Sequence, residues 1–269
     1  MFLRSISLAF LTFTLVACGS GGAGSDSSSE NNGKAPGGLY LGYYAETPDS
    51  NNADDDPTYG AFILRLPNEN GSFTGTMRFT YVGCQTEGNG IVPGDKNGQN
   101  ITGTWQTVLD GIPQQGSYTG QYSTNSQSYS GTYENNARVS QRINVSRACT
   151  GYFDHYFVAA YGTWEMFALE ASYPSNFVIN KTSIRNFSCP DLWPNINTRR
   201  LVYVLDPEIS TTSGTPVLWQ SFTVNSSTSI SVPNTVALES GKTYVLAVAI
   251  SDAASGSRLA FSSKSFIAP

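Results

Sequence analysis

The single histidine of the chain, His155, limits the catalytic chemistry that the sequence can support. It is flanked by Asp154 and aromatic residues, but the sequence has no Gly-x-Ser-x-Gly turn to present a nucleophile. Histidine-based metal sites need several such residues at ligand spacing. Glu165 and Glu170 are the nearest candidates for a glycosidase pair, although nothing in their spacing places both at one cleft. We therefore expect a protein that is not an enzyme and that holds no cofactor.

One carboxylate cluster is dense enough to suggest a bound cation. Asp54, Asp55 and Asp56 follow Asp49 in a polar stretch, and oxygen-rich loops of this kind bind calcium. The Asp-x-Asp-x-Asp-Gly pattern of a calcium loop is absent, and Pro57 follows at once. A solvated loop is the simpler interpretation, which leaves the three adjacent aspartates as weak metal candidates.

The N-terminal segment ends in a cysteine whose thiol could carry a lipid. Arg4 precedes an apolar run from Ile6 to Ala17, and Cys18 follows the small residue at its end. The run is too short to span a bilayer as a helix, but it fits the apolar part of an export signal. This order of features resembles the lipobox of bacterial lipoproteins, in which the peptide before the cysteine is removed and the cysteine is acylated.

The lipobox resemblance implies a cellular location. Residues 1–17 would be a signal peptide, and the lipid on Cys18 would attach the chain to a membrane. In this family an aspartate after the cysteine holds the protein at the inner membrane. Gly19 and Ser20 stand there instead, which implies the outer membrane. Whether the protein faces the periplasm or the cell surface is left open.

Three cysteines remain once Cys18 is assigned to the anchor. Exported proteins form disulfides, and we favour a bond between Cys84 and Cys149, which both fall in the first folded region. A bond between Cys149 and Cys189 would instead join the two regions. One thiol is left over in either case, and no Cys-x-x-Cys spacing indicates a redox role.

Composition and charge define the tether and exclude one class of partner. Removing Arg4 with the signal peptide leaves 14 of the 15 basic side chains beside 20 acidic ones, a net charge of −6. A mildly acidic chain lacks the electrostatic surface that nucleic acids require. Residues 18–37 are rich in Gly, Ser and Asn without a large apolar residue, which predicts a flexible tether. The rest suits two domains, at 38–173 and 174–269.

The region 38–173 consists of short alternating runs that share a motif. Repeats such as Ile101-Thr-Gly-Thr-Trp105 and Tyr129-Ser-Gly-Thr-Tyr133 place aromatic or β-branched residues on one side of a strand. We expect the glycine to lie on the opposite face, or to mark a bulge or a bend. The pattern predicts an all-β antiparallel meander, either barrel or sandwich, with a hairpin loop at Ser123–Gln127. Its Gly-Thr-Trp and Gly-Thr-Tyr strands are similar to those of avidin-like and lipocalin-like barrels.

The region 174–269 carries a sharper pattern. The stretch Leu238-Glu-Ser-Gly-Lys-Thr-Tyr244 is similar to the Leu-x-x-Gly-x-x-Tyr stretch of fibronectin type III domains, in which the tyrosine opens a central strand. Runs at Arg200–Leu205, Val217–Val224 and Arg258–Ile267 match further strands of that fold. The resemblance implies an immunoglobulin-like β-sandwich, in which the hydroxyl of Tyr244 bonds to the backbone at a chain corner.

A lipid anchor, a tether and two β modules favour the display of a binding surface over catalysis. We expect a protein or glycan partner in the envelope or outside the cell, and the oligomeric state is left open. Tyr40, Tyr43, Tyr44 and Tyr59 lie near expected loops and are candidate ligand-binding residues, although core packing is the simpler interpretation. The alternative is a carrier of a small apolar ligand inside a barrel. A hydrolase of envelope glycans is a weaker alternative.

Overall fold

The computed structural model describes residues 35–46, 58–81, 87–109, 112–135, 142–144, 154–156, 161–209, 211, 216–224, 227–255 and 257–268. Every regular element in these ranges is a β-strand, as the alternating sequence predicts. The strands form a closed barrel, a five-stranded sheet, a three-stranded sheet and one separate pair. The prediction of an all-β fold is confirmed for these residues.

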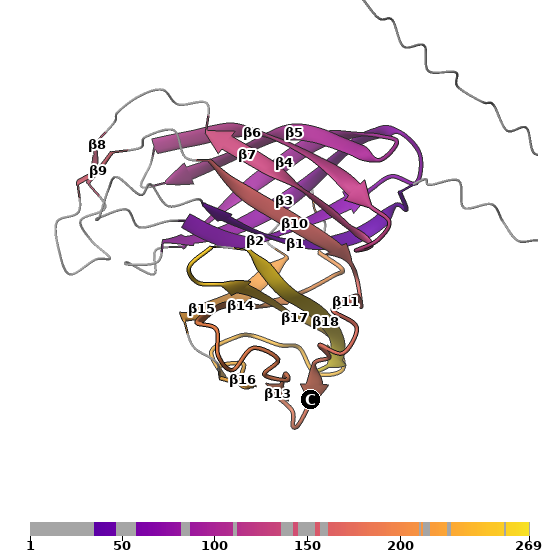
Figure 1. The fold of residues 1–269 in the computed structure, drawn as a ribbon, viewed down its shortest axis with the longest axis vertical. Coiled ribbons are helices and arrows are strands. Elements are labelled where there is room, and N and C mark those ends of the chain that lie inside the picture. The colour runs from indigo at the N-terminus through magenta and orange to yellow at the C-terminus, as the bar shows by residue number, and fades with distance from the viewer. Residues whose placement is uncertain are drawn as a thin grey trace, which may run out of the picture. The chain divides into compact units, whose positions relative to one another are not determined.

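The barrel is an antiparallel meander whose first and last strands pair with each other. In order around the barrel, its strands are β1 (Gly38–Glu46), β10 (Tyr161–Ala168), β7 (Ser128–Asn135), β6 (Ile112–Ser123), β5 (Asn100–Leu109), β4 (Glu87–Asn97), β3 (Gly71–Tyr81) and β2 (Thr58–Leu66) (Figure 1). Pairing from Tyr40 with Ala168 to Glu46 with Gly162 closes it. The expected hairpin loop joins β6 to β7. The separate pair, β8 (Arg142–Asn144) with β9 (Asp154–Tyr156), lies between β7 and β10 in the sequence.

The glycines of the repeats line the inside of the barrel together with the rings. The expectation that they lie on the opposite face is wrong, because residues two apart in a strand share a face. Gly120, Gly131 and Trp164 lie side by side on β6, β7 and β10. A β-carbon on Gly120 would lie too close to the Trp164 ring, so the ring occupies the space that a side chain at this position would need.

Rings and aliphatic side chains from every barrel strand fill the interior. Buried members of this cluster include Tyr40, Phe62, Leu64, Phe73, Val92, Ile101, Tyr118, Tyr129, Trp164 and Met166. Eight-stranded barrels are narrow enough for side chains to fill them. The described part of the barrel is therefore packed as a core.

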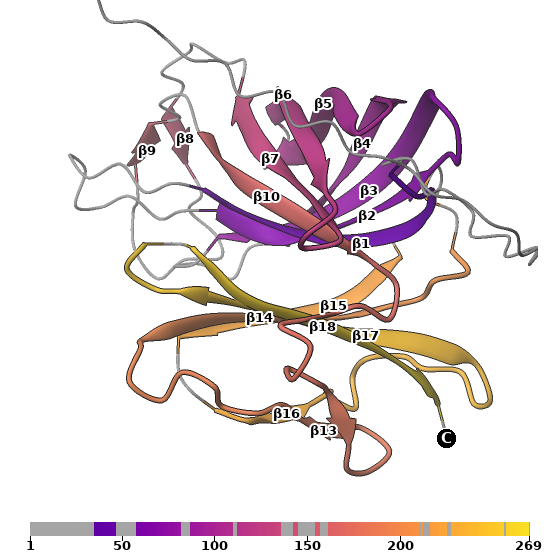
Figure 2. The same cartoon turned by 45° about the vertical axis from the view of Figure 1, so that its right-hand side comes forward.

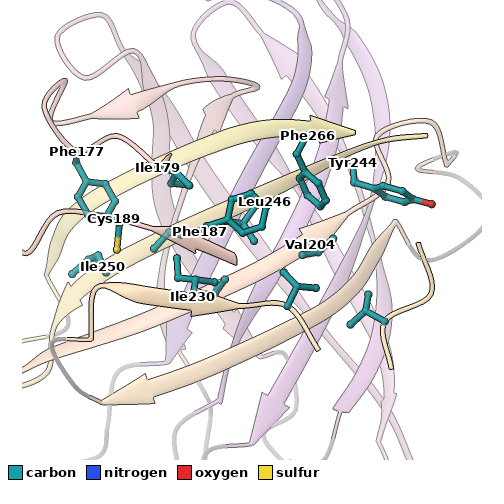
Figure 3. Close-up of a cluster of buried hydrophobic side chains, with 14 of the residues drawn as sticks. Phe177, Ile179, Phe187, Cys189, Val204, Ile230, Tyr244, Leu246, Ile250 and Phe266 are labelled. Carbon is teal, nitrogen blue, oxygen red and sulfur yellow. The ribbon is translucent and has the colours of Figure 1, made fainter. Parts of the chain in front are cut away.

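Two sheets pack face to face in the C-terminal region. The first contains, in spatial order, β11 (Ser172–Tyr173), β18 (Arg258–Ile267), β17 (Thr243–Asp252), β14 (Thr198–Leu205) and β15 (Val217–Val224). The second contains β12 (Asn180–Lys181), β13 (Asn186–Ser188) and β16 (Ser229–Ser231). Phe187 and Ile230 from the smaller sheet pack against Val204 and Leu246 from the larger one (Figure 3). The expected corner bond is present, since the hydroxyl of Tyr244 accepts the Glu239 N–H at 2.9 Å.

The outer face of the five-stranded sheet packs on one wall of the barrel, formed by β1, β2 and β10 (Figure 2). Phe261 of β18 stacks on Phe167 of β10, with ring centroids 4.4 Å apart and planes 7° apart. The hydroxyl of Tyr203 donates to the Gly42 carbonyl of β1 at 3.4 Å. Leu41 and Ile63 of the barrel are fully buried in this contact. The contact therefore covers this wall of the barrel and leaves β5, β6 and β7 outside it.

Candidate functional site

Two of the four tyrosines predicted to bind a ligand point into the barrel. The ring of Tyr40 contacts Tyr129 edge-on at 5.3 Å, and the ring of Tyr44 contacts Tyr133 in the same way at 5.6 Å. The Tyr40 hydroxyl donates to the Pro36 carbonyl at 2.9 Å, and burial raises its pKa. Both tyrosines are buried, so they contribute to the packed interior.

The other two tyrosines lie outside the barrel, beneath the five-stranded sheet. Tyr59 is buried and stacks on Phe222, with centroids 3.8 Å apart. Tyr43 stacks on Phe261 at 6.4 Å, and burial raises the pKa of its hydroxyl. Core packing, the simpler interpretation of the four tyrosines, agrees with the structure, in which Tyr40, Tyr44 and Tyr59 are buried and Tyr43 is half-buried. Their role in binding a ligand stays a prediction.

The two carboxylates considered for hydrolysis make separate structural contacts. Glu165 is buried beneath the five-stranded sheet, where it forms an ion pair with Arg258. It also accepts from the hydroxyls of Ser128 at 2.8 Å and Tyr43 at 3.3 Å. Glu170 is exposed and accepts a backbone N–H of β18 at 2.8 Å. Through its donors the Glu165 carboxylate connects β10 to β7 and to β18.

Most of the remaining predicted site residues cannot be placed on this fold. His155 lies in β9, opposite Ile143 of β8. Cys189 is a free, buried thiol in the C-terminal core, so the alternative bond from Cys149 to Cys189 is not formed. Among the described residues, no cluster of three or more His, Cys, Asp or Glu could hold a metal ion. The following lie outside the described ranges: Cys18, Asp54, Asp55, Asp56, Cys84 and Cys149.

One end of the barrel is closed by a buried lysine. The Nζ of Lys96 donates to the carbonyls of Ala35 at 2.7 Å, Pro67 at 2.9 Å and Asn68 at 3.2 Å. Because Lys96 is only 2% exposed, these charge-assisted bonds lie in a low-dielectric site and strengthen accordingly. The bond to Ala35 and the bond from Tyr40 to Pro36 hold the segment that leads into β1. The chain therefore enters the barrel at its closed end.

The barrel wall that the C-terminal sheet leaves free is exposed and almost uncharged. It comprises the outward residues of β5, β6 and β7 and the first residues of β10, and we call it the hydroxyl face. Its members are Thr102, Thr104, Gln106, Gln115, Ser117, Thr119, Gln121, Ser130, Thr132, Glu134, Tyr161 and Thr163. All of these carry hydroxyl or amide groups except Glu134, so the face offers many neutral hydrogen-bond donors and acceptors. Val108, the last described outward residue of β5, is exposed and apolar.

A row of threonines crosses the hydroxyl face in register. Thr102 pairs with Thr119, Thr119 with Thr132, and Thr132 with Thr163. Neighbouring strands lie about 4.8 Å apart, so the row presents one hydroxyl and one methyl group at roughly that interval. Each of the four threonines is exposed. The row forms a regular, uncharged strip across four strands.

Tyr161 is the exposed aromatic residue of the hydroxyl face, with 57% of its surface accessible. It stands directly opposite Glu134, which in turn stands opposite Ser117. The hydroxyl of Ser117 donates to the Glu134 carboxylate at 3.3 Å. An open ring thus lies beside a carboxylate and several hydroxyls on one surface. This arrangement suits non-covalent binding of a partner that has both an apolar side and hydrogen-bonding groups.

No known protein family model matches the chain, and no curated protein sequence matches it. Within the described residues there is no helix of the length and apolar character needed to cross a membrane. The hydroxyl face is the surface that we carry forward as the candidate site.

Tyr161 was not predicted as a candidate binding residue, because it lies in the most aromatic segment of the chain and aromatic residues there are expected in the core. A signal was available in the alternation of that segment. Trp164 and Met166 fall on one face of the strand and Tyr161 and Thr163 on the other. If Trp164 is taken as a core residue, alternation along the strand places Tyr161, three residues earlier, on the outer surface.

Proposed function

We propose that this protein is a lipid-anchored envelope protein, without catalytic activity, that displays its barrel to bind a macromolecular partner. The observation that carries the proposal is the division of the outer barrel wall. One side is buried under the five-stranded sheet through Leu41, Phe167 and Phe261. The other side, the hydroxyl face, is exposed and rich in hydrogen-bonding groups. A large open surface of this kind on a rigid scaffold suits recognition.

The way in which the chain enters the barrel supports display. Lys96 and Tyr40 hold residues 35 and 36 at the closed end. The stretch before them, lipidated at Cys18 under this proposal, would span about 25 Å as a flexible Gly/Ser-rich chain. Such a tether lets the barrel stand off the outer membrane and turn its side wall towards a partner. The location follows from the lipobox resemblance, and the side of the membrane stays open.

For residues 174–269 we propose a fibronectin type III-like module that acts as a support for the barrel. Counted from β12, the first, second and fifth strands form one sheet, and the third, fourth, sixth and seventh form the other. In immunoglobulin-type sandwiches strands A, B and E are likewise separated from C, F and G. The bond between Tyr244 and Glu239 at the start of the sixth strand also supports the proposal.

A carrier of a small apolar ligand is less well supported than a binding protein. Such a carrier needs interior space, whereas Tyr118 and Phe62 each contact the Trp164 ring edge-on at 6.0 Å across the barrel. Tyr122 and Tyr129 lie 5.0 Å apart towards the closed end. Ring contacts of this density leave the described interior to the protein's own side chains.

The test is to alter the hydroxyl face in the full lipidated chain and to measure capture of envelope proteins and glycans from detergent. Thr119→Lys and Thr132→Lys together place two long cations in the middle of the face. Both residues are exposed, so we expect each single substitution to change unfolding stability by less than about 0.5 kcal/mol. The double variant should lose somewhat more, because the two cations stand directly opposite each other. The matched control, Ile184→Lys, alters an exposed residue of the C-terminal module.

We expect the double variant to lose at least tenfold in partner binding while the control retains it. Equal binding by the double variant and the wild type would place the partner elsewhere and contradict the proposal. In parallel, Cys18→Ala should release the protein from the outer-membrane fraction. Retention of that variant in the membrane would refute the lipid anchor.

A further inference from the structure

The chemistry of the hydroxyl face narrows the class of partner, on the basis of the binding function proposed above. Tyr161 offers an open ring face. It pairs with Glu134 on the adjacent strand, and Thr163 lies two residues further along its own strand. A pyranose ring has an apolar face of C–H bonds and a rim of hydroxyls. The apolar face packs on an aromatic ring, and the rim pairs with hydroxyl, amide and carboxylate groups. The surroundings of Tyr161 supply both kinds of contact.

The charge of the face favours a neutral ligand. Glu134 is the one charged member of the hydroxyl face, and Asp95 stands next to the end of the threonine row, opposite Thr102. Both are acidic, and the face contains no Lys or Arg to pair with a sulfate, phosphate or sialic acid carboxylate. An anionic glycan would meet unpaired like charge here, whereas a neutral one would not.

The distribution of apolar residues distinguishes a glycan from a protein partner. Protein interfaces have an apolar core surrounded by a polar rim. Here the order is reversed, because Thr119 and Thr132 occupy the centre of the face. The open apolar residues stand at its borders. Tyr161 lies at one side, and Val108, 58% exposed, and Ile91, 43% exposed and opposite Gln106, lie at the other. A polar centre suits a ligand that is itself covered with hydroxyl groups.

The threonine row gives the ligand a direction. Its hydroxyls repeat across strands at roughly 4.8 Å, and the row ends at Thr163, two residues along β10 from Tyr161. A chain of neutral sugars lying across the strands could place one ring on Tyr161 and direct its next hydroxyls to Thr132 and Thr119. We infer that the hydroxyl face is a binding site for neutral glycan chains, with Tyr161 as the stacking residue and the threonine row as the hydrogen-bonding strip.

The experiment measures binding of the full lipidated chain, in detergent micelles, to a printed array of oligosaccharides. The array holds neutral glucans, mannans, galactans and N-acetylglucosamine oligomers, with sialylated and sulfated glycans of matched length beside them. The variants are Tyr161→Ala, which removes the ring, and Tyr161→Phe, which retains it. Thr132→Val removes one hydroxyl of the row at similar volume, and Val108→Ala is the control at the other border.

We expect binding to one or more neutral series and none above background to the anionic ones. Tyr161→Ala should weaken that binding at least tenfold, Thr132→Val threefold or more, and Tyr161→Phe and Val108→Ala less than twofold. Neutral glycan binding that survives Tyr161→Ala would overturn the inference about the site. Binding confined to anionic glycans would overturn the inference about the ligand. If the array stays blank while the wild type captures an envelope protein, the glycan inference fails and the proposed binding function stands. If neither happens, both fail.

Discussion

Replacing Phe261 by alanine tests whether the barrel wall and the five-stranded sheet form one packed body. The Phe261 side chain has no accessible surface and stacks between Phe167 at 4.4 Å and Tyr43 at 6.4 Å. Truncation of a buried phenylalanine removes its transfer free energy and leaves a cavity, which together cost about 3–5 kcal/mol. In a chain of this size each kcal/mol lowers the melting temperature by about 2–4 °C, so we expect a decrease of roughly 6–20 °C.

The assay is urea denaturation of the full chain, with the melting temperature as a second measure. The control is Ile267→Ala on the same strand, because Ile267 is 60% exposed and its truncation should cost less than about 0.5 kcal/mol. Phe167→Ala completes a double-mutant cycle, for which contacting rings should couple by about 0.5–1.5 kcal/mol. A loss for Phe261→Ala no larger than that of the control, or additive effects of the two phenylalanines, would refute the packing described above.

Three further predictions concern the barrel and its contact with the sheet. Gly120→Ala should lower the free energy of unfolding by about 1–3 kcal/mol, because its β-carbon meets the Trp164 ring. The loss should be smaller in a Trp164→Phe background. An equal loss in both backgrounds would argue against the clash. Lys96→Met should lower the free energy of unfolding by about 2–4 kcal/mol, since it removes the donor from buried carbonyls. It should also speed proteolysis next to residue 35. Unchanged cleavage would show that the lysine does not hold this segment. Burial raises the pKa of Tyr43 and Tyr203 above the ordinary 10.0, so the folded state retains protons that the unfolded chain releases. Stability should therefore be full below pH 10 and fall as the pH rises above it, and equal urea midpoints at about pH 8 and about pH 11 would contradict that sign.

The local pattern of the sequence was sufficient to predict the strands, but it was not sufficient to predict that the barrel closes. Alternation around Trp105 and Tyr118 predicts a curved antiparallel meander, and the hairpin at Ser123–Gln127 follows from local turn chemistry. Closure depends on pairing of β1 with β10, which are far apart in the chain, and no local propensity specifies that pairing. The corner bond of Tyr244 was predicted because its motif is local.

Alternation in the sequence could not show how Tyr43 and Tyr44 are packed. Successive residues of a strand face opposite sides, so Tyr43 and Tyr44 cannot both face a core in a simple barrel. The structure buries Tyr44 inside the barrel and half-buries Tyr43, because the C-terminal sheet covers the outside of β1. A contact between distant segments leaves no mark in the alternation of β1 itself. Tyr161, on the uncovered part of β10, is the residue that stays open.

The most direct test of a glycan site on the hydroxyl face is hydroxyl-radical footprinting of the full chain, with and without a saturating neutral oligosaccharide from the array. Exposed Tyr161 should oxidise readily in the free protein and become protected at least threefold when the oligosaccharide is bound. Two control residues are buried Tyr203 and exposed Ile184, which lies in the C-terminal region. Each should oxidise at the same rate with and without the oligosaccharide. Unchanged oxidation of Tyr161 in a chain that demonstrably holds the oligosaccharide would contradict the account.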